Sequence, residues 1–540
     1  MEIIRKLIQV EHKRWVIGSS ILAFLLLLPL FFLFTSILEV PSADFFYLWD
    51  TLLIDYSINT FYLILITCFS SILFGVLPAW FVSAYNFKYK NFYDVVLYLP
   101  LAIPTYIMAF TYSDLLSYTG PLQVFLRKVS PNLATYFNQD YLQIEILGII
   151  LGFALYPYVY TALRVSFSLI GTSYIQLAKN IGVTDFKLFF KVILPLSKPA
   201  LFAGVFLVIM EVLNEYGAVK YFGVNTYTTG IFRAWFSMGS ESTAIQLACM
   251  LILIVAFLFL IEKMSQKKAK FYYQSNTKLD SLIVPGYSAK ILIYFVCSIP
   301  FIFGFLIPFL FILNNSLTHF WSTDFRHLFQ LSLNSIKISS IAAFFIILLA
   351  LIFVYVEKIS RLKINSFLTN LTSVGYVIPG AVIALSIILL FTKFTLFNTS
   401  YLIGSFCVLI YAYVFRFLAV GKTPIKSSLD KQPDSYDVVS KSLGLHSFEI
   451  LKKIHFPLNR LALIIAFIVT FIDLLKELPI TLILRPFNFD TLATQTYEFA
   501  VEEMLQKSSI YSLAIILIGG GLLIFLKYIT NKQIHASKSF

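Results

Sequence analysis

Long stretches of apolar residues recur along the whole chain. The first begins at Trp15 and ends at Phe34, and the last covers residues 508–530. A helix of roughly 20 apolar residues crosses the hydrocarbon core of a bilayer, and each stretch is about that long. We therefore predict twelve membrane-spanning helices. Their expected positions are residues 15–37, 58–84, 92–112, 143–170, 196–216, 243–261, 291–314, 333–356, 366–392, 399–420, 459–478 and 508–530.

Composition agrees with this pattern. Of the 540 residues, 59% are hydrophobic and only 13% are charged, whereas a soluble domain is about one quarter charged. The expected fold class is therefore an all-α polytopic membrane protein, and the lipid bilayer is its first partner. The first apolar stretch is longer than the core of a signal peptide and lacks a small-residue cleavage site, so we expect it to be retained as a span.

The net charge of +13 has a topological explanation. If both termini are cytoplasmic, the cytoplasmic segments hold more than three times as many Lys and Arg residues as the external loops, as the positive-inside rule requires. The first external loop, residues 38–57, contains four acids and no basic residue. Because the positive charge recurs at alternate loops and is not gathered on one soluble face, a nucleic-acid partner is not expected.

The chain contains an internal repeat. Ser57-Ile58-Asn59-Thr60 matches Ser332-Leu333-Asn334-Ser335 with an offset of 275, and further pairs match with offsets of 255 and 262. A polar, basic stretch at residues 263–290 separates the two copies. We predict a first half at residues 1–262, a cytoplasmic linker at 263–290 and a second half at 291–540. Two parallel six-helix repeats imply pseudo-twofold symmetry about an axis along the membrane normal, with a pathway between the halves.

Two predicted cytoplasmic loops, at about residues 174–195 and 436–457, share a pattern. Each has a short helix, a glycine, a second amphipathic helix and a proline thirteen residues after the glycine. The glycines are Gly182 and Gly444, and the prolines are Pro195 and Pro457. A single copy could be a helix lying on the lipid headgroups, but two copies at matching places favour a shared docking function.

These loops resemble the EAA loops of ABC-importer permeases, whose signature is Glu-Ala-Ala, three residues, Gly, and a later Pro. In that family the loop docks on an ATPase subunit, so the resemblance implies a coupling role for both loops. The positions carried over are Gln176, Ala178, Gly182, Pro195, Val438, Ser440, Gly444 and Pro457. Gln176 and Val438 stand where the family has its glutamate, which leaves any ion pair made by that glutamate in doubt.

A second resemblance concerns cargo. Residues 214–236 and 476–498 are similar to corresponding segments of ferric-iron permeases, which are also fused twelve-span chains. The resemblance implies an inner-membrane permease that takes ferric iron from a periplasmic solute-binding protein and works by alternating access. Two ATPase subunits, expected as a homodimer, would drive it. Fused permeases for thiamine or another small solute, and a twelve-span ion-coupled secondary transporter, remain as alternatives.

The chain itself is not expected to be an enzyme or to bind a cofactor. Gly421-Lys422-Thr423 resembles the end of a phosphate-binding loop, but Arg416 stands where that loop needs a glycine. ATP hydrolysis is therefore assigned to separate subunits.

Four acids complete the candidate residues. Glu211 and Glu215 are four residues apart, as are Asp473 and Glu477, so each pair is predicted to share one helix face near the outer end of a span. Acids inside a membrane are costly and mark either a pathway or a buried structural partner. For Asp473 that partner would be Lys476. No stable metal site is predicted.

Overall fold

The computed structural model describes residues 2–36, 40–169, 185–267, 283–360, 363–393 and 402–536. Within these ranges the chain is helical and contains no strand, apart from one isolated bridge between Tyr85 and Ile283. Nine helical stretches are long and apolar enough to cross a membrane, and three bent helix pairs bring the number to twelve. The predicted all-α polytopic fold with two repeats is confirmed.

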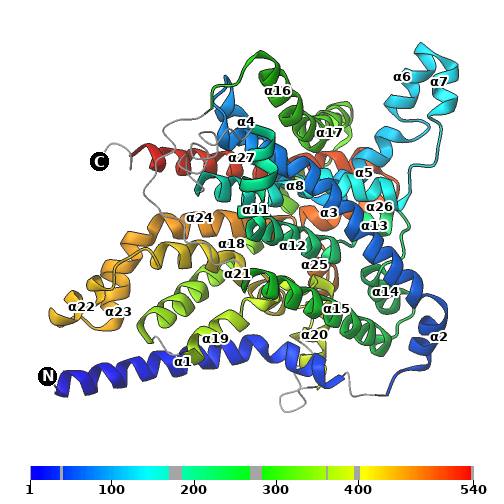
Figure 1. Ribbon diagram of the computed structural model, residues 1–540. Coiled ribbons are helices and arrows are strands. Elements are labelled where there is room, and N and C mark those ends of the chain that lie inside the picture. The colour runs from blue at the N-terminus through cyan, green and yellow to red at the C-terminus, as the bar shows by residue number, and fades with distance from the viewer. Residues whose placement is uncertain are drawn as a thin grey trace.

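The helices of the first half are coloured from blue to green in Figure 1. They are α1 (Glu2–Ser36), α2 (Ala43–Thr51), α3 (Leu53–Ala84), α4 (Lys90–Val96), α5 (Thr105–Leu116), α6 (Pro121–Val129), α7 (Pro131–Tyr136), α8 (Ile144–Leu169), α10 (Asp185–Leu188), α11 (Leu194–Leu196), α12 (Lys198–Asn214), α13 (Gly217–Tyr221), α14 (Tyr227–Phe232) and α15 (Glu241–Lys267).

The second half repeats this order. Its helices are α16 (Tyr287–Phe301), α17 (Ile307–Thr318), α18 (Phe325–Ser360), α19 (Lys363–Leu371), α20 (Gly380–Lys393), α21 (Phe406–Leu429), α22 (Ser435–Ser442), α23 (Ser447–Ile450), α24 (Phe456–Leu475), α25 (Pro479–Leu484), α26 (Leu492–Val501) and α27 (Leu505–Ala536). Helix α15 extends beyond residue 262, so the predicted linker begins inside a helix, and residues 268–282 of that linker lie outside the described ranges.

Three of the predicted spans are not single straight helices. The third is bent by 90° between residues 102 and 105, the fifth by 67° at Ser197, and the ninth by 114° between residues 377 and 380. Pro104 and Pro379 stand at the first and third of these breaks, where a ring in place of the N–H interrupts the helix.

The repeat is visible in individual hydrogen bonds. Asn59 Nδ2 donates to Asn225 O (3.1 Å), and Asn334 Nδ2 donates to Asp490 O (3.2 Å). In the same way, the Thr60 hydroxyl accepts the N–H of residue 227 and the Ser335 hydroxyl accepts the N–H of residue 492. The matching Asn-Thr and Asn-Ser pairs in the sequence therefore attach equivalent turns to equivalent spans.

The first helix of each half packs on the other half. Helix α1 lies along α18, α20 and α21, and Tyr411 of α21 donates its hydroxyl to Leu25 O (2.6 Å). Helix α16 packs on α3, and the Tyr93 hydroxyl contacts Ser298 Oγ of α16 (2.8 Å). The two halves thus exchange their first spans.

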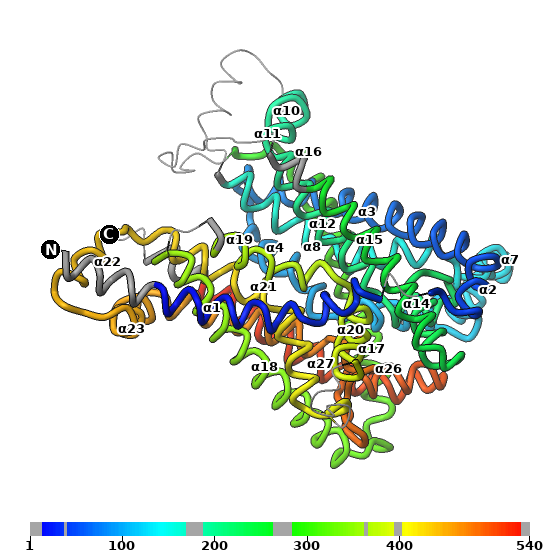
Figure 2. The backbone as a smooth tube through the Cα atoms, turned by 90° about the horizontal axis from the view of Figure 1, so that it is seen from below, coloured from blue at the N-terminus to red at the C-terminus, as the bar shows by residue number. Residues whose placement is uncertain are grey.

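The start of α1, the end of α27 and the α22–α23 pair lie at one end of the molecule in both views (Figures 1 and 2). Helices α2, α7 and α14 lie at the opposite end. This arrangement places the second predicted coupling loop at the same end as the chain termini.

Candidate transport pathway and coupling loop

A cavity of about 70 Å³ lies between the halves and is lined by all four candidate acids. Its walls come from the breaks near Pro104, the ends of α12 and α24, and residues of α8 and α21. Glu211 and Glu215 belong to the first half, and Asp473 and Glu477 belong to the second. The structure therefore brings the four predicted acids into one site on the pseudo-twofold axis.

The prediction that each acid pair shares one helix face is wrong. Helix α12 ends at Asn214 and α24 ends at Leu475, so Glu215 and Glu477 lie beyond the helices. Both carboxylates instead accept N–H groups of the next short helix: Ala218 N donates to Glu215 Oε1 (2.9 Å), and Ile480 N donates to Glu477 Oε2 (3.1 Å). Free N–H groups at a helix start attract a carboxylate, which ends the preceding helix early.

The other two acids have different partners. Glu211 Oε1 accepts the hydroxyls of Tyr158 (3.3 Å) and Tyr376 (2.9 Å), one from each half. Asp473 pairs with Lys476, with 2.9 Å between Oδ1 and Nζ. The structural partner considered for Asp473 is therefore present, and Asp473 still lines the cavity.

Arg416 is a cavity residue that sequence reasoning missed as a site residue. It is buried, and its Nη1 donates to Asn214 Oδ1 of the first half (2.8 Å) and to Ile378 O (3.3 Å). Asn214 Oδ1 also accepts Gly380 N (2.7 Å), so one amide oxygen joins the halves at two points. The available signal was the arginine itself, because a cation inside a span is expensive and needs a buried partner.

The two halves hold their inner glutamates differently. In the first half the Thr105 hydroxyl donates to Glu215. The equivalent residue in the second half is Gly380, where an added Cβ would lie 2.9 Å from Glu477 Oε1 and 3.0 Å from Arg416 Nη1. A side chain at position 380 would therefore have to displace the ends of the Glu477 and Arg416 side chains.

The second predicted coupling loop has the expected geometry. Helix α22 ends in a turn with Gly444 at φ +81°, where Gly444 N donates to Lys441 O (3.0 Å) and Leu445 N to Ser440 O (3.1 Å). This pair of bonds is the Schellman arrangement that terminates a helix with a left-handed residue. Pro457 stands near the start of α24, directly after the π-helical turn Leu451–His455, and therefore lies inside a continuous helix.

Helix α22 offers an apolar surface while its base is fixed. Val438, Val439 and Leu443 are 64%, 57% and 75% exposed, and Ser440 is buried. At the base, the buried His455 ring contacts Asp437 Oδ1 and Gln432 Oε1, each at 2.8 Å. An exposed apolar patch on a rigid support is typical of a docking surface.

The residues at the base of α22 are connected to the cavity through α24. His455 ends the π-helical turn Leu451–His455, which continues directly into α24. Helix α24 spans 20 residues, or about 30 Å at 1.5 Å per residue, and Asp473 lies in its last turn. One continuous helix thus connects the α22 surface with the acids.

The first predicted coupling loop is described only in part. Gln176, Ala178 and Gly182 lie outside the described residues. Pro195 is described and lies in α11, two residues before the 67° bend at Ser197. The first half therefore reaches its acids through a bent helix, and the second half through a straight one.

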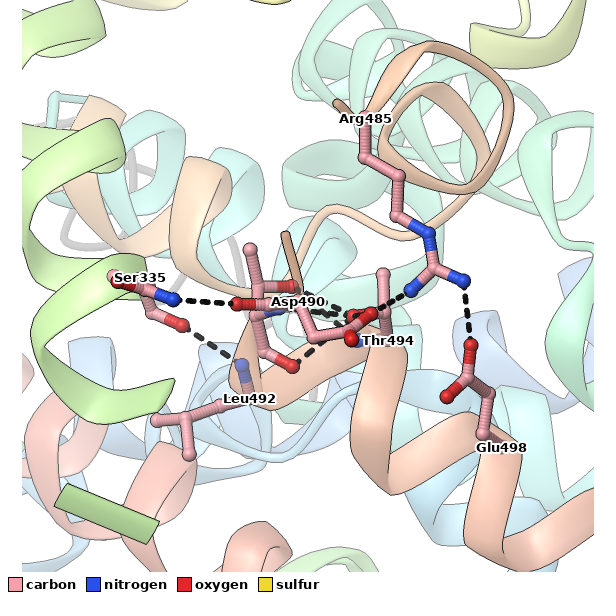
Figure 3. A network of polar contacts seen from close by, with 8 residues as sticks. Ser335, Arg485, Asp490, Leu492, Thr494 and Glu498 are labelled. Carbon is pink, nitrogen blue, oxygen red and sulfur yellow. Dashed lines mark hydrogen bonds and ion pairs between the residues drawn. The ribbon is translucent and has the colours of Figure 1, made fainter. Parts of the chain in front are cut away.

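The segment after α25 is held by charges (Figure 3). Arg485 contacts Asp490 and, through Nη2, Glu498 Oε1 (2.6 Å). In the first half, Arg233 donates to Asn225 Oδ1 (2.8 Å) instead. Because Asp490 and Asn225 each also bind the asparagine of a span, these arginines fix equivalent turns in the two halves.

Comparison with known proteins finds a family match that lies mostly in the first half. Residues 71–271 match the family described as "Binding-protein-dependent transport system inner membrane component". The chain is 25% identical over 469 residues to an Fe(3+)-transport system permease protein, FbpB 2, of Haemophilus influenzae, covering 86% of this chain and 87% of the relative.

Other relatives, named for sulfate or molybdenum transport, match a shorter part of the chain. A sulfate transport system permease protein, CysT, of Salmonella typhimurium is 28% identical over 39% of this chain and 74% of its own length. A molybdenum transport system permease protein, ModB, of Haemophilus influenzae is 27% identical over 37% of this chain and 89% of its own length. With its helical repeats and this family match, the chain is a permease of the ABC importer type, and its first half carries the inner membrane component domain of binding-protein-dependent transport systems.

Proposed function

We propose that the chain carries ferric iron into the cytoplasm, taking it from a periplasmic binding protein. The supporting observation is the cavity between the halves, which is lined by four carboxylates and by two cationic side chains, Arg416 and Lys476. With all six ionised the walls carry an excess of two negative charges (four minus two). Ferric iron is a hard cation that favours oxygen donors.

The charge of the cavity distinguishes between the cargoes for which the relatives are named. Sulfate and molybdate are oxyanions, which a wall with excess carboxylate repels, whereas a cation gains from it. The Fe(3+)-transport permease aligns over 86% of this chain, whereas the sulfate and molybdenum relatives align over 39% and 37% of it. Charge and coverage therefore favour iron over an oxyanion, and a cationic solute such as thiamine is the second candidate on the same charge argument.

The acids are proposed to act as a transient contact and not as a storage site. Within the described residues, no three His, Cys, Asp or Glu side chains are grouped so that they could hold a metal ion. A transport site must bind weakly enough to release its ion. Glu215 and Glu477 would meet the cargo from opposite halves as the pathway opens.

ATP hydrolysis is proposed to drive transport through the two coupling loops, each docked on one subunit of an ATPase homodimer. This assignment places the termini, α22 and α23 on the cytoplasmic side of the inner membrane. Motion of α22 would reach Asp473 through the straight helix α24, since His455 ties α22 to the base of that helix.

The test is uptake of labelled iron into cells that depend on this chain. Replacing Glu215 and Glu477 together by glutamine keeps acceptors for the N–H groups of α13 and α25 and removes two charges. We expect uptake to fall about tenfold, the effect of losing ~1.4 kcal/mol of cation stabilisation. The matched control is Glu502→Gln with Glu503→Gln, which removes two exposed external charges.

The possible outcomes test the transport role of the acids and the identity of the cargo separately. Equal uptake by both double variants, at equal membrane levels, would return the inner acids to a purely structural role. Uptake of labelled sulfate, molybdate or thiamine but not of iron by the unsubstituted protein would replace the cargo and leave the importer in place.

A further inference from the structure

The first half contains an external hairpin that the second half lacks. The repeat offset falls from 275 at residues 103–104 to 255 at residues 156–160, so the first half has 20 additional residues between these points (275 minus 255). The short helices α6 and α7 lie in this interval. In Figure 1 they project from the body at the end opposite α22 and α23.

The hairpin exposes apolar and basic side chains together. Phe125 and Val129 of α6 are each 61% exposed, and Tyr136 of α7 is 72% exposed. Arg127 stacks on Tyr118 and donates to its carbonyl (2.8 Å), while Lys128 is exposed. Aromatic rings and cations on one amphipathic helix are characteristic of the boundary between lipid tails and headgroups.

A groove of about 560 Å³ runs between this hairpin and α17. Pro121 and Val124 line one side, and Ile307, Leu310 and Phe311 line the other. Lys128 is four residues after Val124 and therefore lies on the face of α6 that borders the groove.

The groove changes from apolar to polar toward the external end of the molecule. Asn314 and Asn315 lie near the end of α17, and Gln506 and Thr119 lie beside them. From Ile307 to Asn315 the helix rises about 12 Å. A phospholipid has this same order, with its acyl chain toward the membrane centre and its polar head at the surface.

The groove also opens onto lipid. In the span Tyr287–Thr318 only 28% of the most apolar 18-residue segment is buried inside the molecule. This is the lowest share among the nine unbroken spans found in the described ranges. Leu310 belongs both to this outward surface, with 52% exposure, and to the groove wall. The groove is therefore continuous with the lipid-facing surface of α17.

We infer that this groove binds one glycerophospholipid of the outer leaflet, with an acyl chain along Ile307 to Phe311 and its phosphate at Lys128. The assignment to the outer leaflet rests on the orientation proposed above; the binding itself does not depend on cargo or on ATPase coupling. The bound lipid would attach the hairpin of the first half to the membrane surface.

The test uses the full chain, extracted and washed in detergent, with p-benzoylphenylalanine placed at position 310 or 124 and irradiated before intact-mass measurement. The control is the same replacement at Leu253, which is 57% exposed on another span. We expect an added phospholipid mass at positions 310 and 124 but not at 253. Lys128→Ala should lower the adduct roughly fivefold, the effect of one surface cation near a lipid phosphate, and Lys220→Ala should leave it unchanged.

Two results would overturn the inference. The first is an adduct at position 310 no larger than at 253, or unaffected by Lys128→Ala. The second is a crosslink from position 124 to a protein when intact membranes are irradiated, which would make the hairpin a protein-docking surface. Either result leaves iron uptake untouched, so failure here is distinct from failure of the proposed transport function.

Discussion

Gly444 offers the sharpest test of the coupling loop, because its side-chain position is empty. An added Cβ would meet no atom within 4 Å, so the cost of Gly444→Val comes from the backbone angle of φ +81° alone. A residue with a Cβ pays about 1–2 kcal/mol in the left-handed region. That corresponds to a roughly 5- to 30-fold smaller population of the correct turn.

The expected result is a loss of ATPase retention by the tagged chain of about that size, with a matching loss of transport-stimulated ATP hydrolysis. Gly444→Asn should lose less, since asparagine tolerates the left-handed region. Gly404→Val is the matched control: Gly404 has φ +79° and open space as well, but it precedes α21 and lies far along the chain from the loop. Full ATPase coupling in Gly444→Val, or an equal loss in Gly404→Val, would refute the docking assignment.

Two further predictions concern topology and the base of α22. Reporter fusions after residue 267 or at the C-terminus should report a cytoplasmic location, because the basic loops favour it; an external signal would contradict the orientation. Burial works against ionisation of Asp437, but the hydrogen bond to His455 and the nearby Lys358 charge hold the pKa of Asp437 below its usual value. The stabilisation is therefore complete above pH ~4 and is lost as pH falls below it, so acid should expose α22 to protease in the unsubstituted chain. Asp437→Asn should already be more exposed at neutral pH, and Asp430→Asn should behave like the parent.

The sequence predicted the spans, the repeat and the glycine turn well, because each depends on local properties. Apolar length defines a span whatever packs against it, and the Asn-Thr and Asn-Ser matches turned out to bind equivalent turns. The bends were missed because the expected spans 92–112 and 366–392 were drawn from overall apolar length alone, across Pro104 and Pro379. The two prolines interrupt their helices near the middle of the molecule, and this role is visible only in the three-dimensional structure.

The four acids line one cavity, but the prediction that each pair shares one helix face was wrong. A spacing of four residues places two side chains on one face only if the helix continues, and Glu215 and Glu477 each end it by accepting N–H groups of the next helix. Pro479 at the start of α25 was a usable signal for that break. The role of Arg416 depends on Asn214, 202 residues away in the other half, which no local pattern encodes.

The exchange of first spans has a consequence for biosynthesis. Helix α1 ends at Ser36, but its packing partner α18 begins at Phe325, almost 300 residues later. At about 5–20 residues per second, a ribosome needs roughly 15–60 s to make that partner. During this interval α1 has to remain in the bilayer surrounded by lipid, and residues 15–36 contain no charged side chain that would oppose this. The packing of α1 in the first half can therefore be completed only after the second half has been synthesised, because α18, α20 and α21 belong to that half.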